Sequence, residues 1–240
     1  MSPIPQAAKT AVKRALASGG ITVYRGPNPL SKEWHLLQLF ARYEVDGVID
    51  VGANRGQYGR GLREAGYEGP ILSFEPVPEA FAELAAMSQQ DARWEARNVA
   101  VANEPGTLSM NVAASSSVSS FLTPTAEYTR VYSGMKVQRQ EQVAVVSLDK
   151  VEIPFQRPFL KTDTQGFDLR VLDGAHSLLS DRIVGAQVEL SVIPIYEAMP
   201  EFLEVIASMR QRGFTLTGMF PVETDRAMRV YEFDGIFVRS

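Results

Sequence analysis

The chain has 240 residues, 45% hydrophobic and 22% charged, which suffices for one domain with a large core and is too short for two. Its 24 basic and 28 acidic residues give a net charge of -4, which argues against general attraction to nucleic acid or to an anionic membrane. With no cysteine and only His35 and His176, the chain offers no disulfide, no thiolate chemistry and no cysteine- or histidine-rich metal site.

The N-terminal part carries no targeting or membrane-spanning signal. No stretch approaches the ~20 apolar residues that a membrane span needs. Residues 1–20 place Lys9, Lys13 and Arg14 among alanines, without the apolar run of a secretory signal. We therefore expect a cytoplasmic protein whose residues 1–46 form a helical or lid segment. The alternative for this segment is a short basic amphipathic helix that lies on a membrane.

Apolar runs alternate with helical patterns along the rest of the chain, which is typical of βαβ units around a mostly parallel sheet. The expected strands are 47–51, 71–74, 94–101, 158–162, 184–190, 214–219 and 229–238. The expected helices are 57–65, 78–87, 169–179 and 201–212. A turn-rich segment joins the last two strands, which suits an antiparallel pair. The pattern predicts one α/β domain over 47–240, with a seven-stranded sheet that is parallel except for an antiparallel edge strand.

Residues 106–157 break this alternation after the third expected strand. Two strand patterns, 107–112 and 142–148, are separated by polar sequence that includes the Ala- and Ser-rich run 113–120. Long insertions in compact domains commonly carry function. We expect a β insertion that faces the substrate.

The segment DVGANRG, residues 50–56, follows the first expected strand and opens the first helix of the domain. Gly52 and Gly56 let a ligand approach the backbone, and the helix N-terminus offers free N–H groups. A dinucleotide-binding fingerprint would need a second glycine where Ala53 stands, so close contact with a pyrophosphate is not provided. Asp50 suits the ammonium group of a methionine moiety. The segment favours S-adenosylmethionine over NAD.

A second group of residues points to a nucleoside ligand. Glu75 ends the second expected strand and precedes Pro76, and an acid at this place can accept hydrogen bonds from both ribose hydroxyls. The alternative is an acid that only meets solvent at the end of a strand. By position, Asn98 near the end of the third strand suits the adenine, and Tyr58 suits the methionine end.

Four motifs in order and spacing resemble the FkbM family of methyltransferases: DVGANRGQY at 50–58, SFEPVPEAF at 73–81, LKTDTQGFDLRVLDGA at 160–175 and VELSVIPIY at 188–196. The resemblance covers about 48–239. It implies a class I Rossmann-like methyltransferase fold, S-adenosylmethionine as cofactor and O-methylation, often of sugar hydroxyls or other natural-product alcohols. It also implies that a paired-serine element closes on cofactor or substrate. The predicted cofactor site comprises Asp50, Gly52, Asn54, Gly56, Tyr58, Glu75, Pro76, Asn98, Ser119 and Ser120.

The third motif departs from the family pattern. Many members carry acids in an LKIDVEGAE-like run, whereas Gln165 and Asp168 stand at the two glutamate positions here. The missing charge puts a two-acid or metal-bridged mechanism in doubt, and we predict no metal. A Mg²⁺ ion held by Asp163 and Glu189 stays the alternative, because carboxylates are the ligands it prefers.

Four residues are candidates for the chemical step. Strand alternation puts Lys161 and Asp163 on one face at the carboxyl end of the fourth strand, where they serve the site or form a structural ion pair. Glu189 ends the fifth strand and either takes the hydroxyl proton or bonds to loop backbone. His35 reaches over the site as a base or lid, or simply packs in a helix with Trp34 and Leu37.

The resulting hypothesis is an S-adenosylmethionine-dependent O-methyltransferase that acts on a hydroxyl of a sugar, glycolipid or natural product. Such an enzyme takes a small-molecule or glycan partner and no nucleic acid. An NAD-dependent oxidoreductase or epimerase is one alternative, which Ala53 disfavours. A non-catalytic nucleoside-binding protein is another. The sequence leaves the acceptor and the oligomeric state open.

Overall fold

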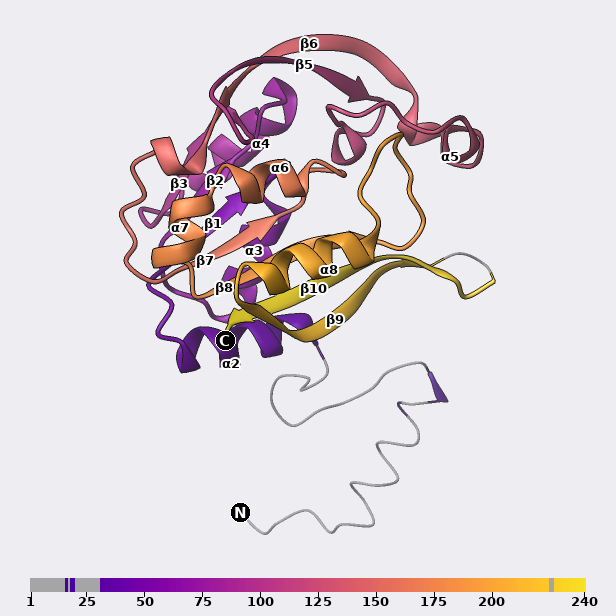
Figure 1. Ribbon diagram of the computed structural model, residues 1–240. Coiled ribbons are helices and arrows are strands. Elements are labelled where there is room, and N and C mark those ends of the chain that lie inside the picture. Colours follow the sequence, from indigo (N-terminus) through magenta and orange to yellow (C-terminus); the bar gives the residue numbers. More distant parts are fainter. Residues whose placement is uncertain (1–15, 17, 20–30, 225–226) are drawn as a thin grey trace.

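Seven strands form the central sheet of the computed structural model, which describes residues 16, 18–19, 31–224 and 227–240 (Figure 1). The strands, in their spatial order, are β3 (Trp94–Arg97), β2 (Ile71–Phe74), β1 (Gly47–Val51), β7 (Pro158–Thr162), β8 (Gly185–Ser191), β10 (Val230–Arg239) and β9 (Phe214–Thr224). Neighbours are parallel except at β10, which is antiparallel to both β8 and β9. The predicted sheet, with its reversed strand near one edge, is confirmed.

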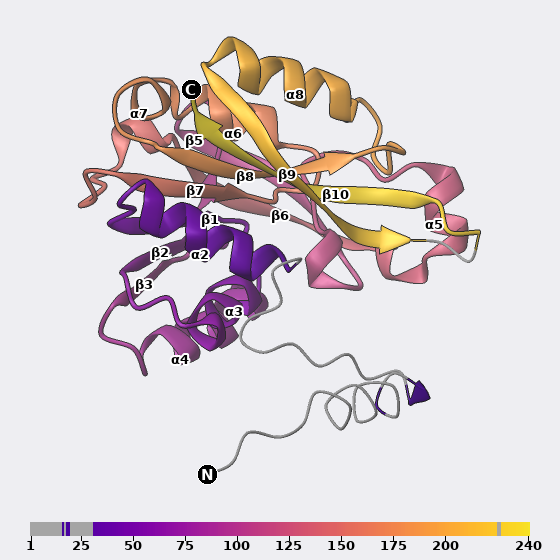
Figure 2. The ribbon, with the colours of Figure 1, turned by 90° about the horizontal axis from the view of Figure 1, so that it is seen from below.

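The sheet lies between two layers of helices (Figure 2). The helices on one face are α2 (Lys32–Arg42), α3 (Gln57–Ala65) and α4 (Pro78–Ser88), and those on the other are α6 (Asp168–Asp173), α7 (His176–Asp181) and α8 (Phe202–Gln211). Alternation in β1 serves both layers, since Val48 packs with α2 and α3 while Ile49 and Val51 pack with α6, α7 and α8. All five residues of β1 are buried, including the charged Asp50, as predicted for a strand at the centre of the sheet.

Residues 106–157 form the predicted β insertion. Its strands β5 (Gly106–Ala113) and β6 (Val137–Val146) pair antiparallel and, with β4 (Ala100–Val101), make a separate three-stranded sheet. The long hairpin arches over the carboxyl ends of the central strands (Figure 1). Between its strands lie η1 (Ser116–Val118), α5 (Ala126–Val131) and η2 (Ser133–Met135), and η3 (Leu148–Lys150) follows β6.

Two expected elements are each divided in the structure. The single strand predicted at 94–101 becomes β3 and β4, which belong to different sheets. The helix predicted at 169–179 becomes α6 and α7, which meet at Gly174. A Cβ atom added at Gly174 would lie 2.1 Å from the carbonyl oxygen of Ala102, and the Gly174 carbonyl accepts the N–H of Asp149. These contacts with distant segments interrupt a helix that the local pattern alone would continue.

The suggested membrane-binding helix at 1–20 lies largely outside the described residues, and Lys9, Lys13 and Arg14 are all outside them. The described part of the N-terminal segment contains α2, which begins after Ser31 and packs on the sheet. No helix in the described parts of the chain is long and apolar enough to cross a membrane.

Gly52 is where the ends of β1 and β7 come closest. Its φ of +71° lies in the left-handed region, and an added Cβ atom would be 1.9 Å from the carbonyl oxygen of Asp163. The sequence motif alone suggests that this glycine serves the approach of a ligand. The structure shows that it is needed first for the approach of another strand end.

We therefore expect Gly52→Ala to lower the free energy of unfolding by more than about 2 kcal/mol, since the side chain adds both strain and a collision with backbone. Urea denaturation measures the change. Gly61→Ala is the matched control: it lies within α3 with no atom within 4 Å of an added Cβ, so it should stabilise the fold by ~0.5–1 kcal/mol. Equal effects at both positions would contradict the role assigned to Gly52.

Candidate active site

A row of buried polar side chains crosses four neighbouring strands of the sheet. Ser73, Asp50, Lys161 and Gln187 are direct register partners on β2, β1, β7 and β8. None is more than 3% exposed. Ser73 Oγ lies 3.2 Å from Asp50 Oδ2 and accepts a hydrogen bond from the Trp94 indole at 3.0 Å. The row lies under the face covered by α2 and α3.

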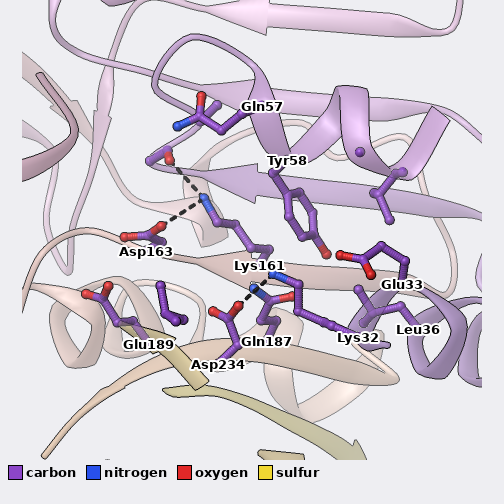
Figure 3. Close-up of a pocket in the computed structure, with 15 residues that line it drawn as sticks. Lys32, Glu33, Leu36, Gln57, Tyr58, Lys161, Asp163, Gln187, Glu189 and Asp234 are labelled. Atoms are coloured by element: carbon purple, nitrogen blue, oxygen red, sulfur yellow. Dashed lines mark hydrogen bonds and ion pairs between the residues drawn. The ribbon is translucent and has the colours of Figure 1, made fainter. Parts of the chain in front are cut away.

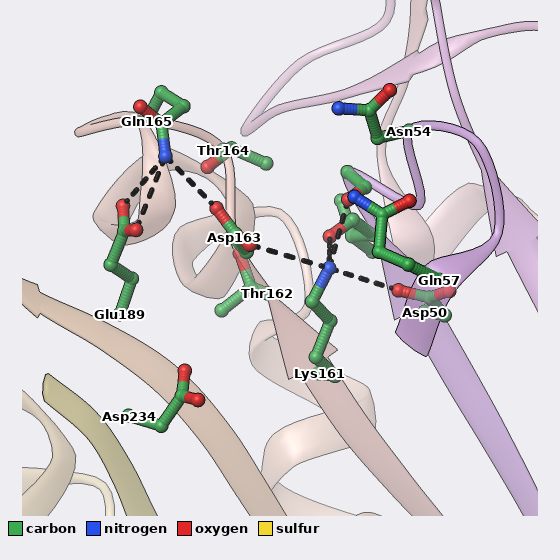
Figure 4. Close-up of polar contacts among 12 residues, drawn as sticks. Asp50, Asn54, Gln57, Lys161, Thr162, Asp163, Thr164, Gln165, Glu189 and Asp234 are labelled. Carbon is green, nitrogen blue, oxygen red and sulfur yellow. Dashed lines mark hydrogen bonds and ion pairs between the residues drawn. The ribbon is translucent and has the colours of Figure 1, made fainter. Parts of the chain in front are cut away.

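The Lys161 ammonium is the centre of this row (Figure 4). It lies 3.1 Å from Asp50 Oδ1 and 3.8 Å from Asp163 Oδ2, and it donates a 2.8 Å hydrogen bond to the carbonyl of Gly52. Burial disfavours the charge, but Asp50 and Asp163 outweigh burial and raise the pKa of Lys161. Lys161 therefore stays charged and ties the end of β1 to the end of β7. The predicted placement of Lys161 and Asp163 on one face agrees with this contact.

Asp50 was expected to meet the ammonium group of the cofactor. In the structure its side chain is fully buried and faces Lys161 and Ser73. It lines none of the cavities described below. In this arrangement Asp50 acts on the site by holding Lys161, and direct contact with a cofactor stays a prediction.

Glu75 lies at the carboxyl end of β2, with its carboxylate held by the backbone. Its two oxygens accept 2.8 Å hydrogen bonds from the N–H groups of Asn54 and Val77. Asn54 has a φ of +47°, in the left-handed region that asparagine adopts more readily than most residues. Burial raises the pKa of Glu75 to about 7, although these hydrogen bonds oppose the shift. Glu75 faces a cavity of about 60 Å³ at the carboxyl ends of the strands.

The insertion supplies the opposite wall of this small cavity, which we call the Glu75 cavity. It is lined by Gly52, Asn54, Gln57, Glu75, Met110, Ser116, Ser117, Ser119, Asp163 and Gln165. Of the predicted serine pair, Ser119 lines the cavity and accepts the N–H of Ala113. Ser120 is buried behind it and donates to the Gln165 carbonyl. Ser116, whose hydroxyl donates to Asn54 Oδ1 at 3.0 Å, was missed because only the folded insertion brings it there.

Three more residues of the predicted cofactor site, Gly56, Pro76 and Asn98, lie near the ends of β1, β2 and β3. Gly56, with a φ of +84°, caps the start of α3. Asn98 is exposed, and its amide donates to the carbonyls of Glu75 and Pro76. It therefore braces the segment after β2, and its contact with an adenine stays a prediction.

Gln165 links the two candidate carboxylates (Figure 4). Its amide nitrogen lies 3.2 Å from Asp163 Oδ1 and 3.1 Å from Glu189 Oε1, and the Tyr196 hydroxyl donates to its amide oxygen at 2.9 Å. Its φ of +54° shows that the backbone is held in an uncommon conformation. The residue that replaces a family glutamate thus acts as a bridge between the two acids.

The two acids differ in their surroundings. The side chain of Asp163 is 40% exposed, whereas Glu189 is 7% exposed. Burial raises the pKa of Glu189 well above its ordinary range, and the nearby Asp163 adds to the shift. Asp163 is therefore the more open of the two carboxylates, and Glu189 favours its neutral form.

A second cavity of about 220 Å³ lies between α2, α3 and the sheet (Figure 3). It shares Gly52, Gln57 and Asp163 with the Glu75 cavity. It is lined by Lys32, Glu33, Leu36, Gly52, Ala53, Gln57, Tyr58, Gly61, Leu62, Lys161, Asp163, Gln187, Glu189, Val222 and Asp234. The structure thereby brings Lys161, Asp163, Glu189 and Tyr58 together around one cavity. We call this space the α2 cavity.

Several lining residues of the α2 cavity are not among the site residues predicted from the sequence. Lys32 on α2 forms a 2.6 Å ion pair with Asp234 on β10, 202 positions away. Gln187 lies within an apolar strand pattern, where it was taken as part of a buried run. A polar residue inside such a run was the one signal that could have identified it.

His35 does not reach the site. Its Nε2 atom lies 3.1 Å from Thr217 Oγ1, and its ring packs against Phe220. It lines a separate cavity with Leu39 and Tyr43. The expectation of a base or lid at His35 is thus not supported, because its ring faces Thr217 and Phe220 of β9.

Asp168 has a structural place at the start of α6. It accepts hydrogen bonds from the Thr162 hydroxyl at 2.7 Å and from the Thr164 N–H at 3.2 Å. Burial raises its pKa to about 6. Within the described residues, no three histidine or acidic side chains are arranged to hold a metal ion.

The fold and sequence of this chain are similar to those of known methyltransferases. A methyltransferase FkbM protein from Methylobacillus flagellatus KT superposes with a TM-score of 0.53 and 13% identity, over 81% of this chain and 44% of that one. The chain thus spans less than half of that protein. Magnesium protoporphyrin IX methyltransferase from Synechocystis PCC 6803, crystallised with S-adenosylmethionine, gives a TM-score of 0.49 and 11% identity over the whole of both chains. No curated protein matches in sequence.

The fold is that of the class I Rossmann-like methyltransferases. Residues 50–216 match the methyltransferase FkbM domain, which is most of the chain. The chain therefore belongs to the FkbM family of S-adenosylmethionine-dependent methyltransferases.

Glu75 also predicts how stability depends on pH. Its pKa in the folded state, about 7, exceeds the ordinary 4.5, so the stability gained from its neutral form is complete below pH 4.5 and is lost as the pH rises through 7. In Glu75→Gln, the fall in the free energy of unfolding between pH 5 and 8 should shrink by ~1–3 kcal/mol. Denaturation at several pH values measures this, with exposed Glu104→Gln as control. If the free energy of unfolding falls as much between pH 5 and 8 in Glu75→Gln as in the wild type, the raised pKa of Glu75 is contradicted.

Proposed function

We propose that this protein transfers a methyl group from S-adenosylmethionine to a hydroxyl of a small-molecule acceptor such as a sugar, a glycolipid or a natural product. The observation that carries the proposal is the junction of two cavities at Asp163. One of the two cavities is lined by Glu75, which is buried and held by backbone hydrogen bonds. The other is lined by Lys161 and Glu189, and the accessible carboxylate of Asp163 lines both. Membership of the FkbM family supports the methyl transfer, and the acceptor class rests on resemblance to that family.

The residues at the Glu75 cavity fit the nucleoside part of S-adenosylmethionine. Each Glu75 oxygen accepts one backbone hydrogen bond, which leaves acceptor capacity for ribose hydroxyls. The backbone of 52–57 would hold the amino-acid end, since Gly52 and Gln57 line both cavities. When bound, the cofactor supplies a methyl group on a positively charged sulfur.

The protein's own part of the reaction is to orient the acceptor and to take its proton. Alcohols are weak nucleophiles, so a placed base is needed. Asp163 suits this role, because it is accessible and its Oδ1 is held by Gln165 while its Oδ2 faces Lys161. Glu189, buried and favouring its neutral form, suits the orientation of the hydroxyl. Alignment of acceptor and donor supplies most of the remaining rate enhancement.

The binding half of the proposal is tested with Glu75→Ala. Loss of charge-assisted hydrogen bonds should weaken binding of S-adenosylhomocysteine roughly ten- to a hundredfold, on the order of 1.5–3 kcal/mol. Isothermal titration calorimetry measures the affinity, and circular dichroism checks that the variant is folded. Glu104→Ala serves as the exposed control. Unchanged affinity in folded Glu75→Ala would rule out this ribose contact.

The chemical half is tested with acceptors found by screening sugars and alcohols for labelled methyl transfer. Asp163→Asn should lower turnover by ~10²–10⁴ with little change in cofactor affinity. Turnover should fall less than about tenfold in Glu189→Gln, because Glu189 already favours a neutral side chain in the wild type. Turnover should fall least in His35→Ala. Single-turnover kinetics separates the three. A loss confined to Glu189→Gln would move the base to that residue.

A further inference from the structure

One end of the α2 cavity carries polar groups that nothing in the described protein satisfies. It is formed by Lys32, Glu33, Tyr58, Gln187 and Asp234, which come from α2, α3, β8 and β10 (Figure 3). We call these five residues the α2 pocket. Gln187 is only 2% exposed, yet its amide oxygen has no hydrogen-bond partner among the described residues. The buried Tyr58 hydroxyl has none either.

Unpaired polar atoms of this kind point to a ligand. A buried donor or acceptor without a partner costs free energy, so native proteins nearly always satisfy them. The Gln187 oxygen can only accept, and the Tyr58 hydroxyl can accept or donate. A ligand with several hydroxyl or amine groups would satisfy both. An apolar ligand would leave both unpaired.

The charges of the cavity disfavour an acidic ligand. Its lining holds four acids, Glu33, Asp163, Glu189 and Asp234, against Lys32 and Lys161. Glu189 favours its neutral form, so the other three acids face the two lysines. Both lysines are already engaged. Lys32 is paired with Asp234 at 2.6 Å, and Lys161 is paired with Asp50 at 3.1 Å. A carboxylate or phosphate entering the cavity would find no lining cation that is not already paired with an acid.

The pocket is continuous with the proposed reaction centre. Asp163 and Glu189 line the same cavity, and Asp163 also lines the Glu75 cavity. A molecule in the α2 pocket would therefore extend toward the carboxylate that takes the proton.

We propose that the α2 pocket binds the methyl acceptor, and that Gln187 and Tyr58 select a small polyhydroxylated molecule, neutral or bearing an amine, over an acidic one. The inference rests on the proposed function and adds to it the place of the acceptor and the sign of its charge.

Three sugars with the same ring test the selection: D-glucose, D-glucosamine and D-glucuronate. Their binding to the protein saturated with S-adenosylhomocysteine is measured by ligand-observed NMR titration. We expect glucose and glucosamine to bind about tenfold or more tightly than glucuronate. Gln187→Leu and Tyr58→Phe should each weaken glucose about three- to tenfold. Gln38→Leu, an exposed glutamine of α2 on another cavity, is the matched control and should change nothing.

The affinity for S-adenosylhomocysteine, measured for each variant, shows which ligand the pocket serves. The proposal expects it to stay within about twofold of the wild type. For Tyr58 this replaces the contact with the methionine end of the cofactor that its position in the sequence suggested, since Tyr58 lines the α2 cavity and not the Glu75 cavity. If Gln187→Leu weakens S-adenosylhomocysteine as much as glucose, the pocket belongs to the cofactor and the proposal fails. It also fails if glucuronate binds as well as glucose, or if no sugar binds while S-adenosylhomocysteine does. A wild-type protein that does not bind S-adenosylhomocysteine would overturn the proposed function itself, and the pocket with it.

Discussion

The buried ion pair of Lys161 with Asp50 is the contact on which the arrangement of the site depends. Removing two charges from water is expensive, and such a pair is tolerated only when further hydrogen bonds satisfy it. Here the Gly52 carbonyl and the Ser73 hydroxyl supply them. The same bonds hold the loop after β1 against the end of β7, where Gly52 leaves no room for a side chain. Charge, loop conformation and strand spacing are thus coupled, and loss of one partner would leave the other buried and unpaired.

This coupling explains why a polar row that contains two charges can run through the buried sheet. Each of β2, β1, β7 and β8 contributes one polar residue at the same level, and the row ends at Gln187, whose amide oxygen has no partner within the described chain. At the carboxyl ends of the strands, Gln165 continues the polar contacts to Asp163 and Glu189. An amide can serve two carboxylates at once because its nitrogen carries two hydrogens, whereas a glutamate there would add a third negative charge.

Sequence patterns were sufficient for the features that depend on neighbours along the chain. The buried runs predicted the strands, the helical patterns predicted α3 and α8, and the segment around Glu75 was placed at a strand end. Features that depend on distant segments were not accessible. Asp50 and His35 are suitable residue types, but Asp50 is buried against Lys161 and His35 faces Thr217 on β9. Spacing along a chain does not say which side chain another element will cover.

The same distinction separates the two halves of the site. The cofactor side that we propose includes the short segments 50–58 and 73–77, which lie within the matched family domain. The acceptor side that we propose is built from α2, β8 and β10, which lie far apart in the chain and meet only through contacts such as Lys32 with Asp234. Changes in any of these elements can alter the pocket without disturbing the motifs. Resemblance in the motifs therefore supports the type of reaction more strongly than the identity of the acceptor. Recognition of the acceptor depends on side chains that no short motif contains.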